Sequence, residues 1–139
     1  MFLNELNREL GIAYINLLIE FALVDDKVEQ KERELIERSL KEMNLEKLEL
    51  NKINRQEIIE IIKNAGERVV NIVFFELTRV ALADAEYEMD EVDFIDELAK
   101  EFNISRAKRF QMANYFFKHS EYDEINEDLA KKEAEVFLN

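Results

Sequence analysis

Two stretches of the sequence decide the fold. Residues 22–45 read ALVDDKVEQKERELIERSLKEMNL, and residues 81–104 read ALADAEYEMDEVDFIDELAKEFNI. They align without a gap at an offset of 59 residues, and nine of the 24 aligned positions are identical. Apolar positions are also kept, as in Leu35 and Phe94, so both copies are expected to contain the end of an apolar helix, an acidic turn and the start of an amphipathic helix. This internal repeat predicts two related helical hairpins packed together.

The composition favours an all-α protein in one domain. The 139 residues include no Pro and only two Gly, which disfavours a turn-rich β sandwich or barrel. Hydrophobic residues make up 47% of the chain. Apolar side chains recur every three or four residues, which predicts helices over about 3–24, 28–43, 69–83, 88–102, 105–118 and 120–137, with a short helix between Asn54 and Gly66. We therefore predict a compact bundle of about seven helices that forms a single domain over residues 1–139.

Local signals mark the expected helix ends and the expected centre of the core. The signals are the capping-box pair Asn54 and Glu57, the C′ residue Gly66, the polar stop Asn44, and the N-caps Ser105 and Ser120, the latter with Asp123 three residues on. Gly11 lies inside the first helix, where it is a potential bend. Residues 69–83, VVNIVFFELTRVALA, are apolar on nearly all sides, which predicts the central helix, with Phe74 and Phe75 in the core.

The residue types present exclude several kinds of chemistry. The chain has no Cys, which excludes disulfides, cysteine nucleophiles, thiolate zinc sites and iron–sulfur clusters, and its single His excludes sites with several histidines. The net charge of −13 disfavours nucleic acid and anionic membranes and favours cations or basic partners. No apolar run approaches the roughly 20 residues of a membrane span, and the first residues lack a signal-peptide pattern. The sequence predicts a soluble cytoplasmic protein without nucleic-acid binding or membrane insertion.

Each copy of the repeat carries an acidic triple with the same spacing. One triple is Asp25, Glu29 and Glu32, and the other is Asp84, Glu88 and Glu91. The two Glu of each triple share one helix face, with Cβ atoms about 5 to 6 Å apart, and the Asp approaches them across the turn. Converging carboxylates predict a divalent-cation site, and oxygen-only ligands select Ca²⁺, Mg²⁺ or Mn²⁺. The alternative is that these carboxylates only cap helices, since Glu in a first turn is favoured by the helix dipole.

The charge count favours the second triple as the cation site. Residues 84–101 hold nine acids and one base, a net charge of −8, whereas residues 25–42 hold seven acids and five bases, a net charge of −2. The second copy is not a standard EF-hand. If Asp84 is loop position 1, Met89 replaces the Gly at position 6 and Ile95 replaces the bidentate Glu at position 12.

The repeated pattern resembles the TerB-like family, named for tellurite resistance and also found as the N-terminal domain of some DnaJ-like membrane co-chaperones. The matching segments read ALADAEYEMDE at 81–91 and ALVDDKVEQKE at 22–32, and Asp26 and Ala85 replace the Gly of the family pattern. The resemblance covers the two hairpins. It implies an all-helical fold, metal binding by Asp84, Glu88 and Glu91, and a weaker counterpart at Asp25, Glu29 and Glu32. Without Cys, a thiol-based reduction of tellurite is impossible.

Two further segments carry weaker signals. His119 next to Ser120 is interpreted as a histidine at a helix end in preference to the base of a serine nucleophile, because sequence neighbours need not face each other and no oxyanion-hole loop is visible. Residues 106–118 combine four basic residues with Phe110, Tyr115, Phe116 and Phe117, a pattern that also occurs in single-stranded nucleic-acid binders. The net charge favours instead an amphipathic helix whose aromatic side chains lie in the core. Its basic face is expected to meet the preceding acidic helix or an acidic partner.

The sequence thus predicts a non-enzymatic module of TerB-like type. In the leading hypothesis its acidic turns bind a divalent cation and it acts in stress response or protein interaction. In the alternative it is a metal-free protein–protein interaction domain whose carboxylates cap helices and contact basic partners. A carboxylate-based hydrolase requires a cleft and a positioned substrate, which the sequence does not indicate. The sequence leaves the identity of the protein partner and the oligomeric state open.

Overall fold

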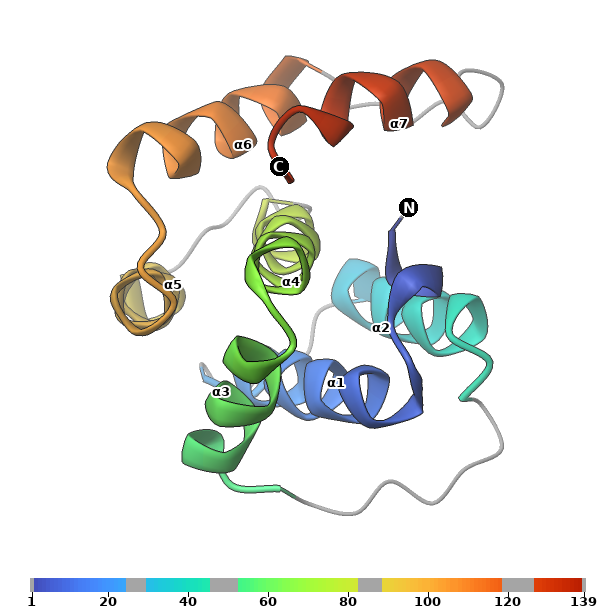
Figure 1. Cartoon of the computed structure of the whole chain (residues 1–139), viewed down its shortest axis with the longest axis vertical. Helices are drawn as coiled ribbons and strands as arrows, with labels where there is room; N and C mark the ends of the chain where they lie inside the picture. The colour runs from blue at the N-terminus through green and yellow to red at the C-terminus, as the bar shows by residue number, and fades with distance from the viewer. Residues whose placement is uncertain (1, 25–29, 46–52, 83–88, 119–126, 139) are drawn as a thin grey trace.

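The computed structural model describes residues 2–24, 30–45, 53–82, 89–118 and 127–138. They form a short 3-10 helix, η1 (Leu3–Glu5), and seven α-helices, with no strand among the described residues (Figure 1). The α-helices are α1 (Arg8–Ala22), α2 (Gln30–Glu42), α3 (Arg55–Asn64), α4 (Glu67–Ala81), α5 (Met89–Glu101), α6 (Arg106–Lys118) and α7 (Glu127–Glu135). The predicted all-α bundle is confirmed.

Helix α4 is the centre of the bundle. In Figure 1 it is seen nearly end-on, with α1 and α3 below it, α2 and α5 on either side, and α6 and α7 across the top. Every side chain from Val70 to Ala81 is buried except that of Arg79. Phe74 and Phe75 are at most 1% exposed. The apolar run of residues 69–83 therefore packs on all sides, as the sequence predicts.

The two segments aligned in the sequence have matching helix bounds. Each bound of α4 and α5 lies 59 residues after the corresponding bound of α1 and α2. Asn44 and Asn103, which follow α2 and α5, both have a positive φ, of 59° and 56°. In both cases the next N–H turns back to the helix: Leu45 donates to the carbonyl of Leu40 at 2.8 Å, and Ile104 to that of Ala99 at 2.9 Å. Asn adopts this left-handed conformation more readily than most residues, so the same residue ends both helices.

The first predicted helix is broken near its start. The sequence predicts one helix over 3–24, but η1 ends at Glu5 and Leu6 is extended, with ψ at 133°. Asn7 then caps α1, because its Oδ1 accepts the N–H of Leu10 at 2.9 Å. This side-chain acceptor satisfies an N–H at the helix start, which allows the chain to begin a new helix there.

Gly11 allows close packing between α1 and a neighbouring segment, and the predicted bend at this residue stays a prediction. Gly11 is buried within the helix, and a Cβ atom at this position would lie 3.1 Å from Cδ1 of Leu45 and 3.2 Å from Sδ of Met43. The absence of a side chain lets α1 approach residues 43–45 closely. Its role is therefore close packing.

Other predicted helix ends are confirmed. Oδ1 of Asn54 accepts the N–H of Glu57 at 2.9 Å, and Oγ of Ser105 accepts the N–H of Lys108 at 3.1 Å. Gly66, with φ at 107°, follows the C-cap residue Ala65 and immediately precedes α4. The predicted start of the last helix at Ser120 and Asp123 lies outside the described residues.

The segment after α7 docks on the core. Leu138 is fully buried, and its carbonyl accepts a hydrogen bond from Nδ2 of Asn71 in α4 at 3.1 Å. The ring of Phe137 stacks near that of Phe75, with centroids 6.4 Å apart. These contacts hold the segment after α7 against the central helix.

Candidate functional site

Most of the predicted metal ligands lie outside the described residues. The structure does not describe Asp25, Glu29, Asp84 or Glu88, nor the side chain of Glu32. Glu91, in the first turn of α5, is described and is 5% exposed. Among the described residues no group of three or more His, Cys, Asp or Glu side chains is arranged to hold a metal ion. The cation site stays a prediction of the sequence.

A buried carboxylate, Glu76, lies on the central helix. Its Oε1 accepts the backbone N–H of Phe2 at 2.9 Å, and its Oε2 lies 3.7 Å from Nη1 of Arg79. Burial raises the pKa of Tyr14 well above its usual range, and the negative charge of Glu76 raises it further. Because Glu76 is 2% exposed and both its oxygens are engaged, this cluster ties the N-terminal segment to α4 and is closed to a ligand.

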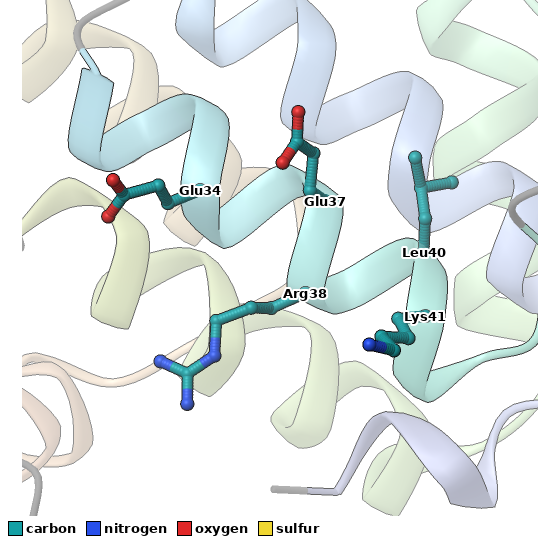
Figure 2. A pocket seen from close by; sticks show the side chains of 5 residues that line it. All are labelled: Glu34, Glu37, Arg38, Leu40 and Lys41. Atoms are coloured by element: carbon teal, nitrogen blue, oxygen red, sulfur yellow. The ribbon is translucent and has the colours of Figure 1, made fainter.

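The exposed side of α2 borders a hollow of about 620 Å³. The lining includes Glu34, Glu37, Arg38, Leu40 and Lys41. Figure 2 shows the two carboxylates and the guanidinium group pointing in different directions from α2. The two acids balance the two bases and the charges do not converge on one point, so these residues lack the convergent polar groups of a ligand site.

A second hollow, of about 420 Å³, lies where α5 meets α6, and we call it the basic hollow. Its lining is Asp96, Ala99, Lys100, Ile104, Arg106 and Arg109. Arg109 forms an ion pair with Asp96, so part of the basic face of α6 meets the acidic helix as predicted. No ion pair of Lys100 or Arg106 is present within the described part of the chain. The basic hollow therefore has two cations, Lys100 and Arg106, that no described acidic residue neutralises through an ion pair.

The inner face of α6 packs against the central helix. Met112 is fully buried and Tyr115 is 6% exposed. The ring of Phe75 lies 5.5 Å from the ring of Tyr115 and 4.7 Å from that of Phe116, measured between centroids. Burial raises the pKa of Tyr115 to about 12. These contacts fix which side of α6 faces solvent.

The opposite side of α6 exposes two large aromatic side chains. Phe110 is 73% exposed and Phe117 is 68% exposed, so the prediction that all four aromatic residues of this segment lie in the core is wrong for these two. Seven residues make nearly two helical turns, so both rings lie on one side of the helix. We define the outer face of α6 as five exposed residues: Arg106, Phe110, Asn114, Phe117 and Lys118.

The sequence contained a signal for this outer face. Phe110 lies two residues before Met112 and Phe117 lies five residues after it, and both spacings place a side chain roughly opposite Met112 on a helix with 3.6 residues per turn. Once Met112 and Tyr115 are assigned to the core, Phe110 and Phe117 have to face outward. The sequence-based prediction treated the four aromatic residues as one group and therefore did not separate the buried ones from the exposed ones.

The comparisons with known proteins identify no relative. No protein-family model, no curated protein and no solved structure matches the chain. The TerB-like resemblance therefore stays a prediction. His119 and Ser120 lie outside the described residues, and no helix in the described segments has the length and apolar character needed to cross a membrane.

Proposed function

We propose that this chain is a non-enzymatic interaction module that binds a partner protein through the outer face of α6. The supporting observation is the exposure of Phe110 and Phe117 on one side of a helix whose other side is already packed. A helix needs only one apolar side to dock on its own core. The second apolar side is available for a partner.

The treatment of phenylalanine elsewhere in the chain supports this proposal. The chain has ten Phe, and the other eight are buried or pack against the core. Burial of one Phe side chain contributes about 1.5 to 3 kcal/mol, which the fold does not gain from Phe110 and Phe117. A partner that covers both rings gains it on binding. Aromatic residues and Arg are also enriched in protein–protein interfaces, and Arg106 lies one turn before Phe110.

The test is site-specific photo-crosslinking in cells that express the full chain. Benzoylphenylalanine replaces Phe110, Phe117 or, as a control, the exposed Glu60 of α3. We expect a discrete adduct from positions 110 and 117 and none from position 60. We also expect the adduct at 110 to disappear when Phe117→Ser is added, because one partner covers both rings.

Absence of an adduct specific to positions 110 and 117 contradicts the proposal. An adduct at 110 that survives Phe117→Ser also contradicts it, because the contact is then not made by the shared face. Thermal unfolding of each variant controls for damage to the fold, and no loss of melting temperature is expected at these exposed positions. A role in stress response, which the TerB-like resemblance implies, stays a prediction.

A further inference from the structure

The charges on α6 are opposite in sign to the charge of the whole chain. The helix has four basic residues and no acidic one, whereas the chain has a net charge of −13. Arg109 is neutralised by Asp96, but Arg106, Lys108 and Lys118 have no ion pair with the residues that the structure describes. A small carboxylate-bearing group is therefore attracted locally to α6, although most of the chain repels it.

The basic hollow continues the outer face of α6 at its N-terminal end. Arg106 belongs to both, since it lines the hollow and lies one turn before Phe110. Lys100 contributes a second cation to the hollow, and Ala99 and Ile104 contribute apolar lining. If an apolar side chain of a partner covers Phe110, a carboxylate that neighbours this side chain on the partner is placed beside the two cations Lys100 and Arg106.

The spacing of the exposed rings fits another helix. Phe110 and Phe117 are about 10 Å apart along the axis of α6, because each residue rises about 1.5 Å. Two turns of a partner helix cover the same distance, with apolar side chains at positions i and i+7 over the two rings. An apolar side chain at i+3 or i+4 then lies over Asn114.

We propose that the partner contacts the outer face of α6 with an acidic amphipathic helix, and that one of its carboxylates enters the basic hollow. This inference rests on the proposed function and adds the chemistry of the partner. A single helix covers α6 without extending far over the acidic surface around it. Nucleic acid, an anionic membrane and a second copy of this chain are larger anions, and the net charge repels them more strongly.

The test is a titration of the ¹⁵N-labelled full chain with a synthetic peptide, followed by NMR. The peptide has about 18 residues, long enough to populate a helix, with Leu at positions i, i+4 and i+7 and Glu or Asp around them. The control peptide has the same Leu positions with Lys in place of each acid. We expect the acidic peptide to shift amide signals of residues 100–118 and to bind at least about tenfold more tightly than the Lys peptide.

Three variants locate the binding to the proposed surface. Phe110→Ser with Phe117→Ser is expected to weaken acidic-peptide binding by about tenfold or more, since the anchoring rings are lost. Arg106→Glu is expected to weaken it by about fivefold. Arg33→Glu, at an exposed position of α2, makes the same change in net charge and is expected to alter binding by less than about twofold. If Arg106→Glu lowers the melting temperature, Lys100→Glu replaces it, because Lys100 is the other cation that lines the basic hollow without an ion pair to the described residues.

Several results overturn the inference. Equal or tighter binding of the Lys peptide contradicts the proposed attraction between the basic hollow and an acidic partner. An equal effect of Arg33→Glu and Arg106→Glu contradicts it as well. Uptake of the chain by phosphatidylglycerol vesicles, or dimer formation in sedimentation, identifies a different occupant if the double Phe substitution abolishes it. If the acidic peptide does not bind while crosslinks at 110 and 117 persist, only the partner chemistry is wrong. If the crosslinks also fail, the proposed function is wrong as well.

Discussion

The two helix pairs that the sequence predicts as hairpins, α1–α2 and α4–α5, have helices of equal length, but their buried residues differ in polarity. Leu17 of α1 aligns with Glu76 of α4 at the 59-residue offset, and both are buried. Leu17 is apolar like its surroundings, whereas Glu76 accepts the N–H of Phe2 and pairs with Arg79. The C-terminal ends of α2 and α5 are set by nearby residues and are alike in both copies. Interior side chains depend on which distant segments reach them, and these differ.

The largest expected effect comes from replacing Glu76 of α4 with leucine, which is the residue at the aligned position 17 of α1. Glu76→Leu leaves the N–H of Phe2 without its acceptor and removes the carboxylate beside Arg79. Removal of one partner of a buried ion pair typically costs about 3 to 5 kcal/mol, and we expect about 3 kcal/mol because Arg79 keeps some contact with solvent. Urea-induced unfolding followed by circular dichroism measures the change.

Glu76→Gln is the matched control for this substitution. It keeps a side-chain oxygen for the N–H of Phe2 and loses only the charge, so we expect a smaller loss of stability than for Glu76→Leu. If Glu76→Leu is as stable as the original chain, the polar contacts of Glu76 contribute no net stability. The interiors of the two hairpins are then interchangeable at this position.

The second expected effect concerns the acidic turns, where the sequence predicts a cation site in the second hairpin. A cation present at 100 times its dissociation constant stabilises the fold by about 2.7 kcal/mol. We expect Asp84→Asn with Glu88→Gln to abolish the gain seen with Ca²⁺, Mg²⁺ or Mn²⁺. The matched pair Asp25→Asn with Glu29→Gln is expected to reduce it less, because its segment carries a net charge of −2 instead of −8.

Thermal unfolding with and without each ion measures this difference. No shift with any of the three ions contradicts the cation prediction and favours carboxylates that only cap helices. A shift that survives both double substitutions places the ion elsewhere on the chain. Equal losses from the two pairs contradict the predicted preference for the second hairpin.

Features that depend on neighbouring residues could be predicted from the sequence. The cap at Asn54, the turn at Gly66 and the cap at Ser105 each need only a side chain or a missing Cβ within a few residues. The buried α4 was also predictable, because its apolar run leaves no polar side for solvent. The all-α fold follows from such local signals added along the chain.

Features that depend on distant contacts could not be predicted in the same way. The role of Gly11 requires the positions of Met43 and Leu45, which lie in the segment that follows α2. The outward orientation of Phe110 depends on α6 turning its Met112 side to α4. The exposure of Phe110 and Phe117 was therefore missed, although the basic face of the same segment was expected to meet the acidic helix or an acidic partner. The residue types of a helix do not show which of its sides faces solvent until one side is known to pack against the core.

The smallest expected effect tests whether the two hairpins end in the same way. Asn44→Ala and Asn103→Ala each force Ala into the left-handed conformation, which costs about 1 kcal/mol relative to a residue that tolerates it. Asn44→Gly and Asn103→Gly are the controls, and they are expected to cause no loss because Gly adopts a positive φ freely. Urea-induced unfolding is expected to show equal losses for the two Ala variants, since the φ values and the hydrogen bonds that follow them are nearly the same. A clearly larger loss at one site would show that tertiary contacts contribute to that helix end, and would limit the likeness of the hairpins to their backbone.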